Sequence, residues 1–392
     1  MVVAKNNVCL TCTMIILMLC HYRTVAQNTE SQKNNPFTLN SKEKLFKPIV
    51  VFENWITYSM NENSNANRLD NQVRRLRFGA TGNPYPWLNY HFQLHFDRLG
   101  EDSYSSTKGS YAGVDIWDAC ISAKLLQQSD LIYVHAGYYW AAISREYNTA
   151  AWAQGSFDRT RANWFMRNFM TGKGNGIESG IGLGGLKNFE KIGISYRIGS
   201  FEPAAYASSR YASRLNTAHI IFLLGEPEQT SYKYRLPGNH WQKRKGISLG
   251  FGASSQTNGR LNDTTYFDQS LAYGADLLIN FAGLRIDGEY FKLKRTSEGL
   301  DDYSGTEWHI RAGYTFEYKQ TFIEPTVTYD KYEGEGNKRL FKYIGNDETL
   351  DIGVNWYLNR DKLKLALHYL IQSGSVASNT GDYIGFAFQV KL

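Results

Sequence analysis

Basic side chains stand at positions in this chain where they could select anions. The segment from Ala141 to Asn175 carries five of them against two acidic residues, Glu146 and Asp158. The five are Arg145, Arg159, Arg161, Arg167 and Lys173. Such cations attract anions most strongly in a narrow, partly desolvated passage, where bulk water weakens charge interactions less. The chemistry that this pattern indicates is electrostatic selection, with no bond made or broken.

A second set of cations falls on segments in which every second residue is apolar, at the alternate, polar positions. This set consists of Arg75, Arg77, Lys124, Arg197, Arg285 and Arg311. The same polar positions also carry carboxylates, namely Asp97, Asp118, Asp276, Asp287, Glu289, Glu307 and Glu317. Two interpretations therefore stay open. The cations either act on passing anions, or they pair with these carboxylates in a wet interior and give little selectivity.

Patterns that would indicate catalysis or a cofactor are weak. Gly180, Gly182 and Gly185 fit a dinucleotide-type spacing, but no helix is expected after them to bind a phosphate. His91 and His95 would stand roughly 13 Å apart on a strand that rises about 3.3 Å per residue, too far to share a metal. We therefore expect no enzyme, no catalytic residue, no cofactor and no metal site.

Elements that could position these cations are strands. From Val51 to Leu392, sixteen segments show apolar residues at every second position, the period of a sheet with two different faces. In the clearest one, Leu88, Tyr90 and Phe92 begin an apolar face, and the residues between them are polar. Aromatic residues make up 15% of the chain, and no sustained helical period occurs.

Links between these segments alternate between short and long. Tight links fall near 82–86, 127–130, 187–189, 281–283, 319–321 and 359–361, and long ones near 60–71, 99–113, 141–175, 200–216, 257–269, 295–305, 332–347 and 373–382. This alternation is typical of an up-and-down meander across a membrane, with short periplasmic turns and long outer loops. In lipid such a sheet has to close, because each unpaired backbone group in hydrocarbon costs several kcal/mol. The sequence thus predicts an all-β, antiparallel transmembrane barrel of about 16 strands. The link at 226–245 breaks the rule, since a tight turn is expected there and its length has no explanation.

The N-terminus reads as an export signal. Lys5, a short apolar run from Met14 to Cys20 and the small residues up to Ala26 predict a signal peptide over 1–26, cleaved near Ala26. A polar arm over 27–48 and a barrel over 49–392 would follow. Without Lys5 and Arg23, 41 basic residues face 37 acidic ones, a balance too small and too dispersed to indicate nucleic acid binding.

Several motifs resemble the phosphate-selective porin O and P family. They are the stretch 74–79, the strand 135–138 running into 144–146, and the tail 353–359. The resemblance extends over about residues 50–392. It implies a 16-stranded and usually trimeric porin, whose pore is narrowed by a loop folded inward after an early strand. Here that loop would be 141–175.

We therefore expect an outer-membrane porin for passive diffusion of small hydrophilic solutes, with a weak preference for anions, of which phosphate is the candidate that the resemblance suggests. Its partners would be outer-membrane lipid, lipopolysaccharide and two further copies of the chain. A plugged barrel that acts as a ligand-binding or adhesive surface protein is the alternative. The alternation also predicts that an Arg at Val354 is costly and that an Arg at Asn355 is mild.

Overall fold

A computed structural model describes residues 45–60, 69–97, 114–207, 213–376 and 381–392. The expected signal peptide and residues 27–44 of the expected arm lie outside these ranges. The first strand begins at Lys47, so positions 47 and 48 of the expected arm belong to the sheet.

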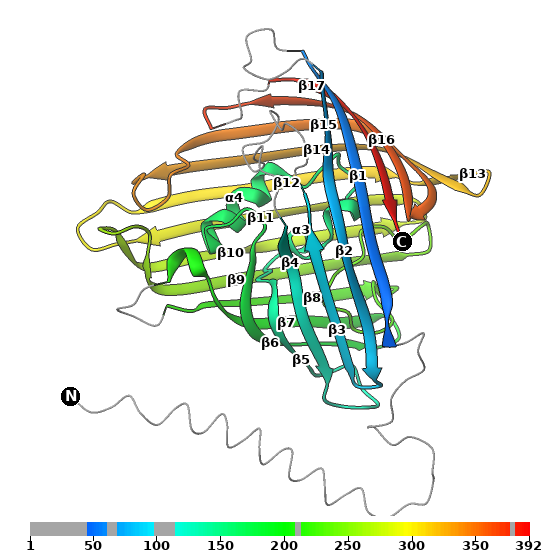
Figure 1. Cartoon of the computed structure of the whole chain (residues 1–392), viewed down its shortest axis with the longest axis horizontal. Helices are drawn as coiled ribbons and strands as arrows, with labels where there is room; N and C mark the ends of the chain where they lie inside the picture. The colour runs from blue at the N-terminus through cyan, green and yellow to red at the C-terminus, as the bar shows by residue number, and fades with distance from the viewer. Residues whose placement is uncertain (1–44, 61–68, 98–113, 208–212, 377–380) are drawn as a thin grey trace, which may run out of the picture. The chain divides into compact units, whose positions relative to one another are not determined.

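One antiparallel sheet contains all the labelled strands (Figure 1). The strands of its first half are β1 (Lys47–Ser59), β2 (Leu69–Tyr85), β3 (Leu88–His95), β4 (Asp115–Lys124), β5 (Tyr133–Trp140), β6 (Ile177–Asn188), β7 (Ile192–Glu202) and β8 (Leu215–Gly225). Those of the second half are β9 (Lys245–Arg260), β10 (Tyr266–Phe281), β11 (Leu284–Thr296), β12 (Tyr303–Tyr314), β13 (Phe316–Tyr318), β14 (Thr321–Gly336), β15 (Gly345–Asp361), β16 (Leu363–Ser373) and β17 (Tyr383–Lys391).

The sheet closes on itself. β1 pairs with β17 from Val51 opposite Lys391 to Ser59 opposite Tyr383. β12 and β13 both pair with β14, so β13 continues the path of β12. The seventeen labelled strands therefore occupy sixteen positions around the barrel. The predicted fold class, a closed antiparallel barrel of 16 strands, is confirmed.

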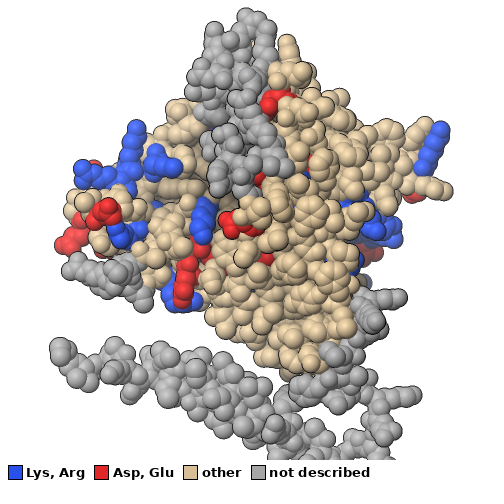
Figure 2. All heavy atoms as spheres, viewed as in Figure 1, with Lys and Arg blue, Asp and Glu red and all other residues tan. Residues whose placement is uncertain are grey.

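Side chains alternate between the two faces as the sequence predicts. On β15, Ile352 and Val354 are 48% and 43% exposed, whereas Asp351 and Asn355 are 4% and 0% exposed. Apolar residues make up the outward set on most strands, and the lower front surface over β2–β4 is almost free of charge (Figure 2). This outer face suits lipid, and the inner face holds the polar and charged residues.

Connections follow the predicted alternation of short and long at most positions. The β9–β10 and β11–β12 links span only 261–265 and 297–302, so the loops expected at 257–269 and 295–305 are shorter than predicted, because the strands extend further. The β4–β5 link, expected to be tight near 127–130, spans 125–132. In the β13–β14 turn both Lys319 and Gln320 have positive φ, the conformation of a tight two-residue hairpin turn.

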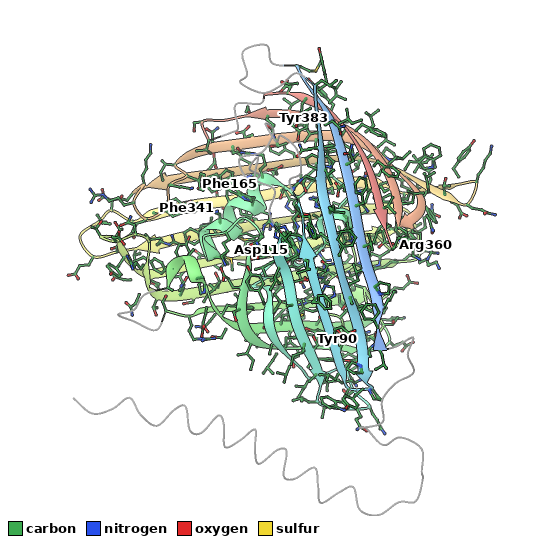
Figure 3. The ribbon with its side chains drawn as sticks, in the orientation of Figure 1. Tyr90, Asp115, Phe165, Phe341, Arg360 and Tyr383 are labelled. Atoms are coloured by element: carbon green, nitrogen blue, oxygen red, sulfur yellow. The ribbon has the colours of Figure 1, made fainter. Side chains whose placement is uncertain are left out.

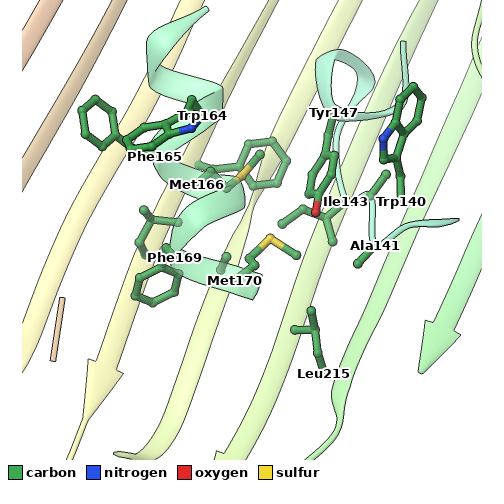
Figure 4. Packing of buried hydrophobic residues seen from close by; sticks show 14 of the residues in the cluster. Trp140, Ala141, Ile143, Tyr147, Trp164, Phe165, Met166, Phe169, Met170 and Leu215 are labelled. Carbon is green, nitrogen blue, oxygen red and sulfur yellow. The ribbon is translucent and has the colours of Figure 1, made fainter. Parts of the chain in front are cut away.

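Buried apolar side chains gather inside the barrel, against the segment that follows β5. There, α4 (Arg161–Thr171) turns Phe165, Met166, Phe169 and Met170 toward the inner wall (Figure 4). No helix within the described ranges is long and apolar enough to cross a bilayer.

Candidate functional site

The segment between β5 and β6 enters the barrel, as the sequence predicts. It contains α3 (Arg145–Asn148), η1 (Ala151–Ala153) and α4. Ser144 and Thr160 cap the two α-helices by accepting from backbone N–H groups three residues later, and Gly172 ends α4 in the left-handed conformation. We call residues 141–176 the constriction loop.

Aromatic residues fix the constriction loop to the wall. Phe157 packs on Trp55 of β1 with ring centroids 4.5 Å apart, and Phe165 stacks on Tyr332 of β14 at 4.0 Å. Phe169 contacts Tyr303 of β12. The loop leaves the wall at β5 and returns at β6, whereas these contacts lie on the arc of strands from β12 to β1. The loop therefore extends across the lumen from the strands that carry it.

Wall carboxylates bind the backbone of the same loop. Asp351 accepts from the N–H of Phe157 at 2.7 Å, and Asp330 accepts from the N–H of Ala162 at 3.0 Å, in the first turn of α4. The N–H of Arg145 donates to Asp276 at 3.2 Å. These lumen acids therefore serve to hold the loop and are not only counterions for pore cations.

A buried ionic network joins the loop to β11 and β12. The Arg311 guanidinium donates to Glu146 and to Asp287, each at 2.9 Å, and His309 Nε2 lies 3.1 Å from Glu146. Burial opposes ionisation of Glu146, but Arg311 and His309 hold its pKa down at about 2. Ligand atoms of Glu146, Asp287 and His309 lie within 4.8 Å of one another, as a metal site would require. The guanidinium already bridges the two carboxylates, so the geometry fits an ion network better than a metal site.

Seven of the ten predicted pore cations are paired with carboxylates. Arg311 bridges Glu146 and Asp287, as described. The other pairs are Arg75 with Glu53 (2.6 Å) and Asp158, Arg77 with Asp97, Lys124 with Asp130 (2.7 Å), Arg145 with Glu228 (2.7 Å), Arg161 with Asp347 (2.7 Å) and Arg285 with Asp287 (2.7 Å). Lys124 lies at the turn end of β4 and lines neither of the two cavities described below.

Arg159, Arg167 and Arg197 differ, because their bonds to the described residues go to carbonyl oxygens. Arg159 donates to Thr149, Arg167 donates from Nε to Asn163 at 3.3 Å, and Arg197 donates to Tyr234 at 2.9 Å. Burial lowers the pKa of Arg159, and the nearby Arg167 lowers it further. The constriction loop thus carries two cations that form no hydrogen bond or ion pair with a described carboxylate.

Two cavities lie in the barrel on either side of the constriction loop. The outer cavity, of about 510 Å³, is lined by Arg159 and Arg167, by the arginines of β2 and by wall residues such as Asp115 and Tyr383, labelled in Figure 3. Its described lining includes seven Lys or Arg residues and five Asp residues, so cations predominate. The inner cavity, of about 450 Å³, is lined chiefly by the link between β8 and β9 and by η1.

The long link at 226–244 also enters the barrel, which the sequence did not predict. Tyr232 Oη lies 3.0 Å from His135 Nε2, and Arg235 forms an ion pair with Asp118. Leu236 N–H donates to the Asn148 carbonyl of the constriction loop at 3.1 Å. Only the excess length signalled this arrangement in the sequence. We call residues 226–244 the inner segment.

Asn355 corrects one prediction about the inner face. It is 0% exposed, and its amide donates to the Gly155 carbonyl of the constriction loop at 2.6 Å. An Arg at this position is therefore expected to be costly and not mild, because the constriction loop occupies the inward face at this level.

A closed 16-stranded barrel with an apolar outside, polar cavities inside and an inserted loop defines a porin of the bacterial outer membrane. The sequence pattern of the family described as phosphate-selective porin O and P matches residues 52–382. The chain belongs to this family, and it is a membrane channel.

Solved outer-membrane proteins share the fold at low sequence identity. OmpF of Salmonella typhi, in complex with daunomycin, has a TM-score of 0.57 and 8% identity, with coverage of 91% of this chain and 100% of that one. An anion-selective porin from Comamonas acidovorans has a TM-score of 0.55 and 12% identity, covering 88% and 99%. OmpT of Vibrio cholerae, expressed in the outer membrane, has a TM-score of 0.54 and 9% identity, covering 91% and 100%. No curated protein matches the chain.

Proposed function

We propose that this porin passes small hydrophilic solutes with a weak preference for anions, and that Arg159 and Arg167 carry the preference. The observation behind the proposal is that both line the outer cavity without a carboxylate partner among the described residues. A paired arginine presents little net charge to a passing ion. An unpaired one in a partly desolvated passage attracts anions and repels cations.

Mutual repulsion between the two guanidinium groups supports the same proposal. Arg167 is one of the causes that lower the pKa of Arg159, so the two charges act on each other. An anion near both of them would relieve this repulsion, whereas a cation would add to it.

Replacing both residues by Gln is expected to lower the anion-to-cation permeability ratio by about threefold or more, since two cations without an ion-paired carboxylate leave the passage. Reversal potentials of the purified barrel in a planar bilayer under a salt gradient measure this ratio. Lys342→Gln serves as the control, because Lys342 is exposed in the β14–β15 loop and lines neither cavity. An unchanged ratio in the double variant would refute the assignment.

Phosphate selectivity, export and assembly are further parts of the proposal. Phosphate preference follows from the family description, and competition between phosphate and chloride in the same recordings tests it. We also propose cleavage of 1–26 near Ala26, contacts with lipid and lipopolysaccharide, and a homotrimer. A trimer form of OmpT from Vibrio cholerae, which has this fold, supports the last point. The mass of the detergent-solubilised, unheated protein distinguishes monomer from trimer.

The alternative function is a plugged barrel that binds a ligand at the cell surface. Contact between the constriction loop and the inner segment inside the lumen favours it. Steady single-channel steps from the wild-type barrel would exclude this alternative, and their absence would exclude the diffusion channel.

A further inference from the structure

Arginine and tryptophan side chains alternate in a row between the two cavities. Arg77 lies over Trp117, with its guanidinium carbon 3.5 Å from the ring centroid, and 5.7 Å from the centroid of Trp152. Arg235 lies 6.0 Å from Trp152 and 4.6 Å from Trp140. Arg159 lies 4.8 Å from Trp140. In order, the row is Trp117, Arg77, Trp152, Arg235, Trp140 and Arg159.

This row reaches from one cavity to the other. Trp117, Arg77, Trp140 and Arg159 line the outer cavity, whereas Trp152 and Arg235 line the inner one, and no described residue lines both. The row therefore lies where the two cavities come close to each other. Three of the residues come from strands and two from the constriction loop, but Arg235 comes from the inner segment.

Contacts on both sides hold Arg235 at this point. Its guanidinium pairs with Asp118 of β4 and lies 3.2 Å from His91 Nε2, which is itself 3.1 Å from Asp118. The neighbouring Tyr234 carbonyl accepts from the Asn148 side chain at 2.6 Å. A Cβ added at Gly238 would lie 1.9 Å from the Ala153 carbonyl oxygen, so only glycine allows this close approach of the two segments.

Near the start of the inner segment, Glu228 forms a bidentate ion pair with Arg145 of the constriction loop, at 2.7 and 2.8 Å. Burial opposes ionisation of Glu228, but Arg145 holds its pKa well below the usual value. The inner segment is thus tied to the constriction loop at Glu228 as well as at Leu236. It forms part of the same constriction, approached from the other end of the barrel.

We propose that the inner segment supplies a specificity-determining residue, Arg235, whose charge balance with Asp118 sets ion selection between the two cavities. This inference rests on the proposed channel function but concerns a different residue from Arg159 and Arg167. Arg235 and Asp118 together are nearly neutral to a passing ion. Removal of either one exposes the charge of the other at the narrow row, with opposite signs.

Single substitutions that keep a polar side chain test the proposal in opposite directions. Arg235→Gln removes the guanidinium partner of Asp118 and leaves His91 Nε2 beside it at 3.1 Å. The anion-to-cation permeability ratio is expected to fall by about fivefold. Asp118→Asn leaves Arg235 uncompensated, and the ratio is expected to rise by about threefold. Lys243→Gln removes an exposed cation of the same segment that lines neither cavity, and it should leave the ratio unchanged.

Reversal potentials of the full-length barrel in a planar bilayer provide the readout. If the wild type conducts with an anion preference but both variants keep its ratio, or both shift it in the same direction, the proposal is wrong. Absence of conductance from the wild type would instead overturn the channel function itself.

A covalent link tests the position of the segment independently of conductance. Thr149 and Leu236 are paired as neighbours in a parallel bridge. Cysteines at these two positions, with Cys120 replaced by Ser, should form a disulfide in the folded barrel under mild oxidation. Reduced thiols in a barrel that still shifts on heating in detergent electrophoresis would show that the inner segment is not inside the lumen, and would overturn the proposal.

Discussion

Substitution of Arg311 by Met should destabilise the folded barrel by about 3–5 kcal/mol, the usual cost of leaving buried charges without their partner. Arg311 is 1% exposed and bridges Glu146 and Asp287, which are 1% and 3% exposed. Without the guanidinium, the two carboxylates repel each other, and the constriction loop keeps only His309 as a cationic partner for Glu146 on β12. Urea unfolding of the refolded protein in lipid vesicles measures the change.

A double variant separates the lost charge balance from lost packing. Glu146→Gln combined with Arg311→Met removes one of the two carboxylates that Arg311 bridged. About 1–2 kcal/mol of the lost stability should therefore be regained. Equal unfolding midpoints for the single and double variants would mean that the network contributes through packing alone.

An Arg at Val354 is the second large effect, with an expected cost of about 2–4 kcal/mol for a cation at the bilayer midplane. Val354 is 43% exposed on the outward face of β15, where its neighbours on the same face are Ile352 and Trp356. A charge there must leave water for hydrocarbon. The fraction of heat-modifiable folded barrel, and its stability to urea, report the effect.

Leu358→Arg is the matched control on the same face of the same strand. It lies two residues from the native Arg360, which is exposed near the turn end of β15 (Figure 3). Near the interface an added Arg is expected to cost only about 0–1 kcal/mol. Equal losses at 354 and 358 would show that depth in the bilayer does not decide the cost.

The barrel itself was predictable from the sequence because every strand has one face toward lipid and one toward the polar interior. Ile352, Val354 and Trp356 need lipid, and the residues between them need polar surroundings, so the alternation shows directly in the chain. The inward course of the constriction loop was predicted from the resemblance to the porin family, in which a loop after an early strand folds inward, and 141–175 has the place and length of that loop.

Charge pairing inside the lumen was not predictable in the same way. Arg161 and Arg167 both begin in one short helix, yet Arg161 reaches Asp347 on β15 and Arg167 meets no described carboxylate. Arg161 and Asp347 are 186 residues apart in the sequence. No local spacing can therefore predict that they form a pair. Asn355 was misjudged for the same reason, because what covers it comes from the distant Gly155.

Arg235 was missed because the inner segment has no periodicity. Its prolines and glycine, Pro227, Pro237 and Gly238, read as an irregular surface link. The unexplained length was nevertheless a usable signal. A polar insertion of this size at the end of the barrel that otherwise has tight turns has room to fold inward.

Closure of β1 against β17 requires that the chain stay unaggregated until its last strand is available. Val51 finds its partner in Lys391, so the seam cannot form until nearly the whole polypeptide has been exported. Until then, two strand edges and a broad apolar face stay open to pairing with other chains. A chain truncated before β17 keeps those edges permanently and should aggregate.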